Sequence, residues 1–128
     1  MSSPLPADAG ERAQLVARAG YEARALNIVV LQVGKLLPFC DYFVICHGRS
    51  PVQNEAICDQ VEERLREAGI RPHHREGEPR GDWTLLDYGD VVLHVFSESA
   101  RRFYDLERLW AEVPRLELQL PVSSGEAG

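Results

Sequence analysis

The chain has very little lysine and no excess of basic residues. Lys35 is its single lysine, and the 14 Lys and Arg residues are outnumbered by 20 Asp and Glu residues, which gives a net charge of −6. Proteins that grip nucleic acid directly need a basic surface that neutralises phosphates. The composition therefore argues against direct nucleic-acid binding.

The acidic excess is concentrated in the second part of the chain. Residues 1–50 carry 5 basic and 4 acidic side chains, a net charge of +1, whereas residues 51–128 carry 9 and 16, a net charge of −7. A solvated acidic surface explains such a balance on its own. If a charged partner exists, this distribution favours a basic one.

Paired cysteines and long apolar runs are also missing. Cys40, Cys46 and Cys58 form no CxxC pair, and the N-terminus shows no basic segment followed by an apolar one. We interpret the three cysteines as buried free thiols in a reducing compartment. Because no apolar run approaches 18 residues, the sequence predicts a cytoplasmic protein that does not span a membrane.

Local patterns predict alternating helices and strands. After a flexible tail over residues 1–8, we expect a helix over residues 9–26, capped by Asp8 and weakened at Gly20, with Leu15, Ala19, Ala23 and Leu26 on its apolar face. Two apolar segments rich in β-branched and aromatic residues, 28–33 and 41–46, are typical of strands.

The second helix has the clearest signals. Ser50 is a good N-cap, Pro51 suits the first turn, and Gly69 suits the position after the end. Its apolar stripe comprises Ile57, Val61, Leu65 and Ala68. A short strand is expected near residues 73–75.

Residues 83–87 and 91–96 then predict a hairpin in which Gly89 supplies the turn. Ser97 or Ser99 caps a last helix that ends at Pro114, with Phe103, Leu106, Leu109 and Trp110 buried. Residues 115–128 are expected to be disordered. This order predicts an α/β (α+β) fold: a single compact domain with a mixed β-sheet flanked by helices.

Several residues could in principle carry chemistry. Asp87 and Asp90 flank the hairpin turn, where they could bind a metal or act as acid and base, but turns favour Asp for conformational reasons alone. Residues 48–50 (Gly-Arg-Ser) lead into a helix N-terminus that could hold phosphate, although no Walker or GxGxxG spacing is present. His94 is interpreted as a buried core histidine. We assign no metal ligand, nucleophile or cofactor.

The aromatic residues Trp83, Tyr88 and Tyr104 could anchor a partner protein or could fill the core. Composition does not separate these alternatives.

The strongest signal is the ordered string itself. Its segments are DYFVIC at residues 41–46, GRS at 48–50, Gly77 with Trp83, DYGDVVLHVF at 87–96, and RFYDLERLW at 102–110. In this order they resemble the ribosomal silencing factor family, also called the Iojap (RsfS) family, from about Ala25 to Trp110. The resemblance implies a nucleotidyltransferase-like topology without nucleotide transfer, and a silencing factor domain over residues 9–114.

The resemblance also implies a function. Family members bind the large ribosomal subunit through its ribosomal protein fourteen and sterically block joining of the small subunit, which represses translation when nutrients are short. They are regarded as non-enzymatic and occur as monomers or homodimers. The implied partner-binding residues are Trp83, Asp87, Tyr88, Asp90 and Tyr104, with Asp82 and Glu107 at the rim. The competing hypothesis is a nucleotidyltransferase-like or metal-dependent phosphohydrolase enzyme that uses Asp87 and Asp90.

Overall fold

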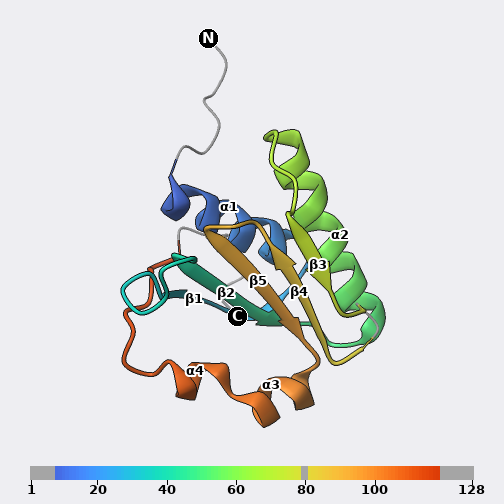
Figure 1. The fold of residues 1–128 in the computed structure, drawn as a ribbon. Coiled ribbons are helices and arrows are strands. Elements are labelled where there is room, and N and C mark those ends of the chain that lie inside the picture. The colour runs from blue at the N-terminus through green and yellow to red at the C-terminus, as the bar shows by residue number, and fades with distance from the viewer. Residues whose placement is uncertain (1–7, 79–80, 119–128) are drawn as a thin grey trace, which may run out of the picture.

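A mixed five-stranded sheet forms the centre of the fold (Figure 1). The structure, a computed structural model, describes residues 8–78 and 81–118. The strands are β1 (Leu26–Gln32), β2 (Tyr42–His47), β3 (His74–Glu76), β4 (Trp83–Asp87) and β5 (Val91–Phe96), in the spatial order β1-β2-β5-β4-β3. Only β2 and β5 run parallel, while the other neighbours are antiparallel. The predicted mixed sheet and the β4–β5 hairpin are thus confirmed.

Two longer helices cover one face of this sheet, α1 (Ala9–Glu22) and α2 (Pro51–Glu67). The Asp8 carboxylate accepts from the Glu11 N–H at 2.7 Å, and the Ser50 hydroxyl accepts from the Gln53 N–H at 3.1 Å. Each cap satisfies an N–H that the helix leaves free, which stabilises it by about 1 kcal/mol. Both predicted caps are therefore confirmed, and Gly69 follows α2 with φ at 82°.

Alternation along the strands divides the core between the two faces. Val44 and Cys46 of β2 lie under α1 and α2, whereas Ile45 points to the opposite face with Phe96 of β5. This opposite face carries the two short helices α3 (Glu98–Tyr104) and α4 (Leu106–Leu109) (Figure 1). Because these helices are short, they cover less of the sheet than α1 and α2 do.

The predicted end of the first helix is wrong by four residues. The chain leaves the helix after Glu22, where Arg24 takes φ at 67° and the Ala25 N–H donates back to the Gly20 carbonyl at 2.9 Å. Leu26 is then free to begin β1. The buried residues are Ala13, Val16, Ala17, Ala19 and Gly20; of the expected stripe, Ala19 is buried and Leu15 and Ala23 are partly buried against the same core.

The predicted buried stripe of the last helix is wrong as well. Asp105 adopts φ at 50°, which divides the expected helix into α3 and α4 and changes which side chains face inward. Phe103 is 80% exposed and Leu109 is 71% exposed, while Leu106 and Trp110 are half-buried against the core. Ala100 and Arg101 are the buried residues of α3.

The segment that follows Pro114 is ordered over its first residues. The Gln32 N–H donates to the Pro114 carbonyl at 2.8 Å, and the Leu116 N–H donates to the Val30 carbonyl at 2.9 Å. Residues 115–118 were expected to belong to a disordered tail, but Arg115 and Leu116 pair with the edge of β1, and the Glu117 carbonyl accepts from Gln14 of α1 at 2.8 Å. The remainder of that tail, 119–128, and residues 1–7 lie outside the described residues.

Candidate partner-binding surface

The β4–β5 hairpin holds apart the partner-binding residues that the family resemblance groups into one site. Trp83 begins β4 and Asp87 ends it, while Tyr88, Gly89 and Asp90 form the turn, with φ at 86° for Gly89. Since a strand rises about 3.3 Å per residue, Trp83 and Asp87 lie roughly 13 Å apart. The expected binding residues therefore occupy opposite ends of the hairpin.

Trp83 lies at the centre of a group of aromatic rings on the face that carries α3 and α4. Its ring centroid is 4.8 Å from that of Phe96 and 4.7 Å from that of Tyr104, and Phe103 packs edge-on against Tyr104 at 5.1 Å. Such offset and tilted contacts are favourable arrangements of aromatic rings. We call the exposed and half-buried members of this group the aromatic surface: Phe43, Trp83, Phe103, Tyr104 and Trp110.

His94 supports the aromatic surface from below. Its side chain is only 5% exposed, and burial lowers its pKa to about 4, so the ring is neutral at pH 7. The Trp83 indole N–H donates to the His94 Nδ1 at 3.1 Å, which assigns the ring proton to Nε2. Phe43 stands edge-on to the same ring at 4.7 Å. The interpretation of His94 as a buried core histidine is confirmed, and its bond fixes the indole.

The two acids of the turn are engaged in local contacts. The Asp87 carboxylate accepts from the Gly89 N–H at 2.7 Å, and the Asp90 carboxylate pairs with Arg12 of α1. These contacts explain both acids as elements that hold the turn and attach it to α1. They do not converge on a shared ligand site with a third acid or histidine among the described residues.

Tyr88 lies away from the aromatic surface. Its side chain is 5% exposed and belongs to the core beneath α1 and α2, and burial raises its pKa. The Tyr88 ring therefore packs on the face of the sheet that α1 and α2 cover, opposite the aromatic surface.

Asp82 and Glu107 lie on either side of the short helix α3. Asp82 precedes Trp83 and accepts from the Ser97 hydroxyl at 3.1 Å, and it is exposed. Glu107 of α4 accepts from Arg101 Nε at 3.0 Å.

Arg101 connects the short helices to the sheet. It is buried and also donates to His47 Nδ1 at 2.9 Å, which attaches α3 and α4 to β2. Burial and Arg101 both lower the pKa of His47, so its neutral ring accepts this bond.

The structure thus brings Trp83, Tyr104 and Asp82 together and separates them from Asp87, Tyr88 and Asp90. Glu107 lies elsewhere, in a hollow lined by Ile28 and Val29 of β1. Phe43 was not expected at the surface, and Phe103, expected in the core, is exposed; Trp110 is half-buried against the core, close to the expectation. The period of two along β2 could have revealed Phe43, because it places that ring on the face opposite Val44.

Free thiols and metal ligands offer no second site in the described chain. Cys40, Cys46 and Cys58 are unpaired and buried, as predicted, and burial raises the pKa of Cys46 to about 12. No group of three or more His, Cys, Asp or Glu side chains within residues 8–78 and 81–118 could hold a metal ion. Nor does any helix described there have the length and apolar character needed to cross a membrane.

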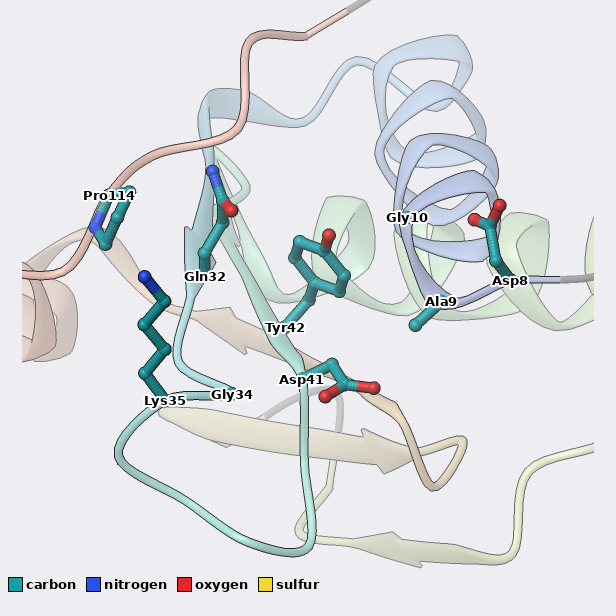
Figure 2. Close-up of a pocket in the computed structure, with 9 residues that line it drawn as sticks. All are labelled: Asp8, Ala9, Gly10, Gln32, Gly34, Lys35, Asp41, Tyr42 and Pro114. Atoms are coloured by element: carbon teal, nitrogen blue, oxygen red, sulfur yellow. The ribbon is translucent and has the colours of Figure 1, made fainter.

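An open cavity of about 580 Å³ lies on another part of the molecule, between the start of α1 and the loop after β1 (Figure 2). Figure 2 shows Lys35 extending toward Pro114, and Asp8 and Asp41 also line the cavity. None of the predicted binding residues lines it. Because the Lys35 amino group and the carboxylates of Asp8 and Asp41 all line this cavity, its charges favour neither an anionic nor a cationic ligand.

The family described as "Ribosomal silencing factor during starvation" matches residues 6–127 of the chain. A protein of Halalkalibacterium halodurans named ribosomal silencing factor RsfS is 37% identical over 113 residues, which cover 88% of this chain and 97% of that protein. The protein of the same name from Bacillus subtilis is 38% identical over 105 residues, covering 82% and 89%. The chloroplastic protein Iojap of Zea mays is 34% identical over 106 residues, covering 80% of this chain and 45% of that protein.

Solved structures show the same fold. A crystal structure of a protein from Bacillus halodurans matches with a TM-score of 0.72 and 38% identity, covering 82% of this chain and 95% of that one. A crystal structure of a protein from Chromobacterium violaceum matches with a TM-score of 0.78 and 29% identity, covering 93% and 97%. The similarity thus extends over nearly the whole length of both solved proteins.

Proposed function

The chain belongs to the ribosomal silencing factor (RsfS) family, and on this premise we propose that it binds the large ribosomal subunit through ribosomal protein fourteen. Bound there, it sterically blocks joining of the small subunit and represses translation when nutrients are limiting. It acts in the cytoplasm, as a binding protein and not as an enzyme. The domain that does this spans residues 9–114.

The exposed aromatic surface is the observation that carries this proposal. Monomeric proteins rarely expose several neighbouring aromatic side chains, and such groups commonly serve as partner anchors. Trp83 is held in one orientation by His94, and Phe103 and Tyr104 extend the surface toward solvent. A pre-oriented ring loses little conformational freedom on binding, which favours affinity.

Acidic side chains at the rim complement a basic ribosomal protein. Asp82 adjoins Trp83, and Glu107 lies on α4. Asp87 and Asp90 are contact residues at the far end of the same hairpin. Tyr88 acts by supporting the turn, since its buried ring does not reach a partner in this conformation.

If the protein is also a homodimer, the aromatic surface is the place where self-association would compete with the ribosome.

The proposal is tested by co-sedimentation with purified large subunits, followed by a subunit-joining assay. We expect Trp83→Ala to weaken binding by on the order of 2 kcal/mol, which is roughly a 30-fold loss, and to restore joining. Val52→Ala, which shortens an exposed apolar side chain on α2, serves as the matched control and should bind like the unaltered chain. Folded Trp83→Ala protein that still co-sediments and blocks joining would refute the assignment of this surface.

A further inference from the structure

The carboxyl ends of β2 and β5 open onto a crevice that shares only Asp82 with the proposed partner-binding residues. The two strands are parallel neighbours, so both end at the same edge of the sheet. The chain leaves β2 for α2 on one face and leaves β5 for α3 on the other (Figure 1). In open α/β sheets, ligands bind at the point where successive connections diverge to opposite faces.

Polar groups of both signs line this crevice, which has a volume of about 330 Å³. Its lining includes Arg49, Ser50, Asn54, Asp82, Glu98 and Arg102. The volume lies at the small end of the range for ligand sites, which suits a compact polar molecule.

The wall formed by α2 favours an anionic group. This helix is 17 residues long, and its first turn follows Gly48, Arg49 and Ser50. Pro51 has no N–H and the Gln53 N–H is bonded to Ser50, so the attraction for phosphate comes mainly from the helix dipole, and Arg49 adds a charged donor. Arg49 is exposed at this place, beside the N-terminus.

Asn54 provides an independent indication of a ligand. Its side chain is only 2% exposed, and its Oδ1 has no hydrogen-bond donor among the described residues. The oxygen lies against Gly48, where an added Cβ would come within 2.2 Å of it. A buried oxygen without a donor is costly, and it favours a site where a bound molecule donates a hydrogen bond.

The opposite wall restricts the kind of anion. Asp82 accepts from the Ser97 hydroxyl at 3.1 Å, and Glu98 pairs with Arg102 at 3.3 Å. These carboxylates repel a bare phosphate dianion but accept hydrogen bonds from hydroxyl groups. The ligand that suits both walls has a phosphate at one end and hydroxyls next to it.

We propose that the crevice at the carboxyl ends of β2 and β5 binds a sugar phosphate. The phosphate lies at the N-terminus of α2 beside Arg49, and the hydroxyls approach Asn54 and Asp82. The crevice shares Asp82 with the rim of the proposed ribosome-binding surface, but Arg49 and Asn54 belong to the crevice alone. Variants at these two residues therefore distinguish a failure of this site from a failure of the proposed ribosome binding.

The test is a titration of the isotope-labelled full chain with ribose 5-phosphate, inorganic phosphate and ribose, followed by NMR. We expect saturable shifts of the Gly48, Ser50 and Asn54 amide signals, with ribose 5-phosphate binding at least tenfold more tightly than either fragment. Asn54→Ala should weaken binding by about tenfold, since it removes the buried acceptor, while the melting temperature stays unchanged or rises.

Arg49→Gln provides a second measurement that does not alter the buried residue, and it should also cost about tenfold. Arg71→Gln, at an exposed arginine beyond the far end of α2, is the matched control and should bind normally. The proposal would be overturned if ribose 5-phosphate caused no saturable shift. It would also be overturned if inorganic phosphate bound as tightly as ribose 5-phosphate, or if Asn54→Ala and Arg49→Gln both bound ribose 5-phosphate like the unaltered chain.

Discussion

The bond between Trp83 and His94 makes the protonation state of one buried ring important for the whole aromatic surface. With His94 neutral, Nδ1 accepts from the indole N–H. Protonation would place a second N–H donor opposite the first, and it would charge a ring packed among Phe43 and Phe96. The indole would then lose its partner, and the buried charge would lack compensation.

This predicts a dependence of stability on pH. The pKa of His94 is about 4 in the folded chain, against 6.5 for an ordinary histidine, so the unfolded chain binds more protons between these values. The stabilisation is fully present above pH 6.5 and is lost as the pH falls toward 4, by about 3 kcal/mol at most. Urea unfolding over this range should show a shallower pH slope for His94→Asn, which keeps an acceptor near the Nδ1 position.

His73→Gln is the control, because His73 is an exposed histidine in the loop before β3. It should retain the slope of the unaltered chain. An identical slope in His94→Asn would mean that other groups, such as the buried His47, carry the pH dependence.

The two short helices determine how much of the aromatic surface is exposed. A continuous helix from Glu98 onward would turn a different set of side chains toward the sheet, but the left-handed conformation of Asp105 divides it. Within α3, Ala100 and Arg101 face inward, Phe103 points to solvent, and Tyr104 lies over Trp83. The position of α3 thus decides the shape of the surface.

The cap of α3 is therefore expected to affect stability and the surface together. Ser97 Oγ accepts from the Ala100 N–H at 3.1 Å and also donates to Asp82, whereas Ser99 lies within the first turn and is not the cap. Ser97→Ala should lower the free energy of unfolding by about 1 kcal/mol. Ser99→Ala should lower it by much less, and thermal unfolding of the two variants compares them directly. Equal losses in both would contradict the assignment of Ser97 as the cap.

The molecule as a whole shows which features follow from local sequence and which do not. The caps at Asp8 and Ser50 and the hairpin at Gly89 were predictable, because each depends on a few neighbouring residues. The mixed sheet was predictable only as a class from the order of helices and strands, because its parallel pair joins the distant strands β2 and β5. The exposure of Leu109 was not predictable, because it follows the break at Asp105, which helical spacing does not reveal. Motif similarity brought Trp83 and the turn acids into one candidate site, but only the register of the hairpin shows that they lie at its opposite ends.

Net charge belongs to the molecule as a whole, and it predicts how the chain finds its partner. The charge of −6 arises from residues 51–128, which also contain Trp83 and the short helices. Electrostatic attraction to a basic protein speeds association and is screened by salt, whereas an aromatic anchor mainly slows dissociation. Rising ionic strength should therefore lower the association rate with the proposed partner, isolated ribosomal protein fourteen, and leave the dissociation rate nearly unchanged.

A charge variant tests whether one acid guides this encounter. In surface plasmon resonance, Asp82→Asn should lower the association rate severalfold at low salt, while Glu63→Gln, which removes the same charge from α2, should change it less. Equal effects of the two variants would mean that the overall charge guides the encounter and that Asp82 has no special place in it.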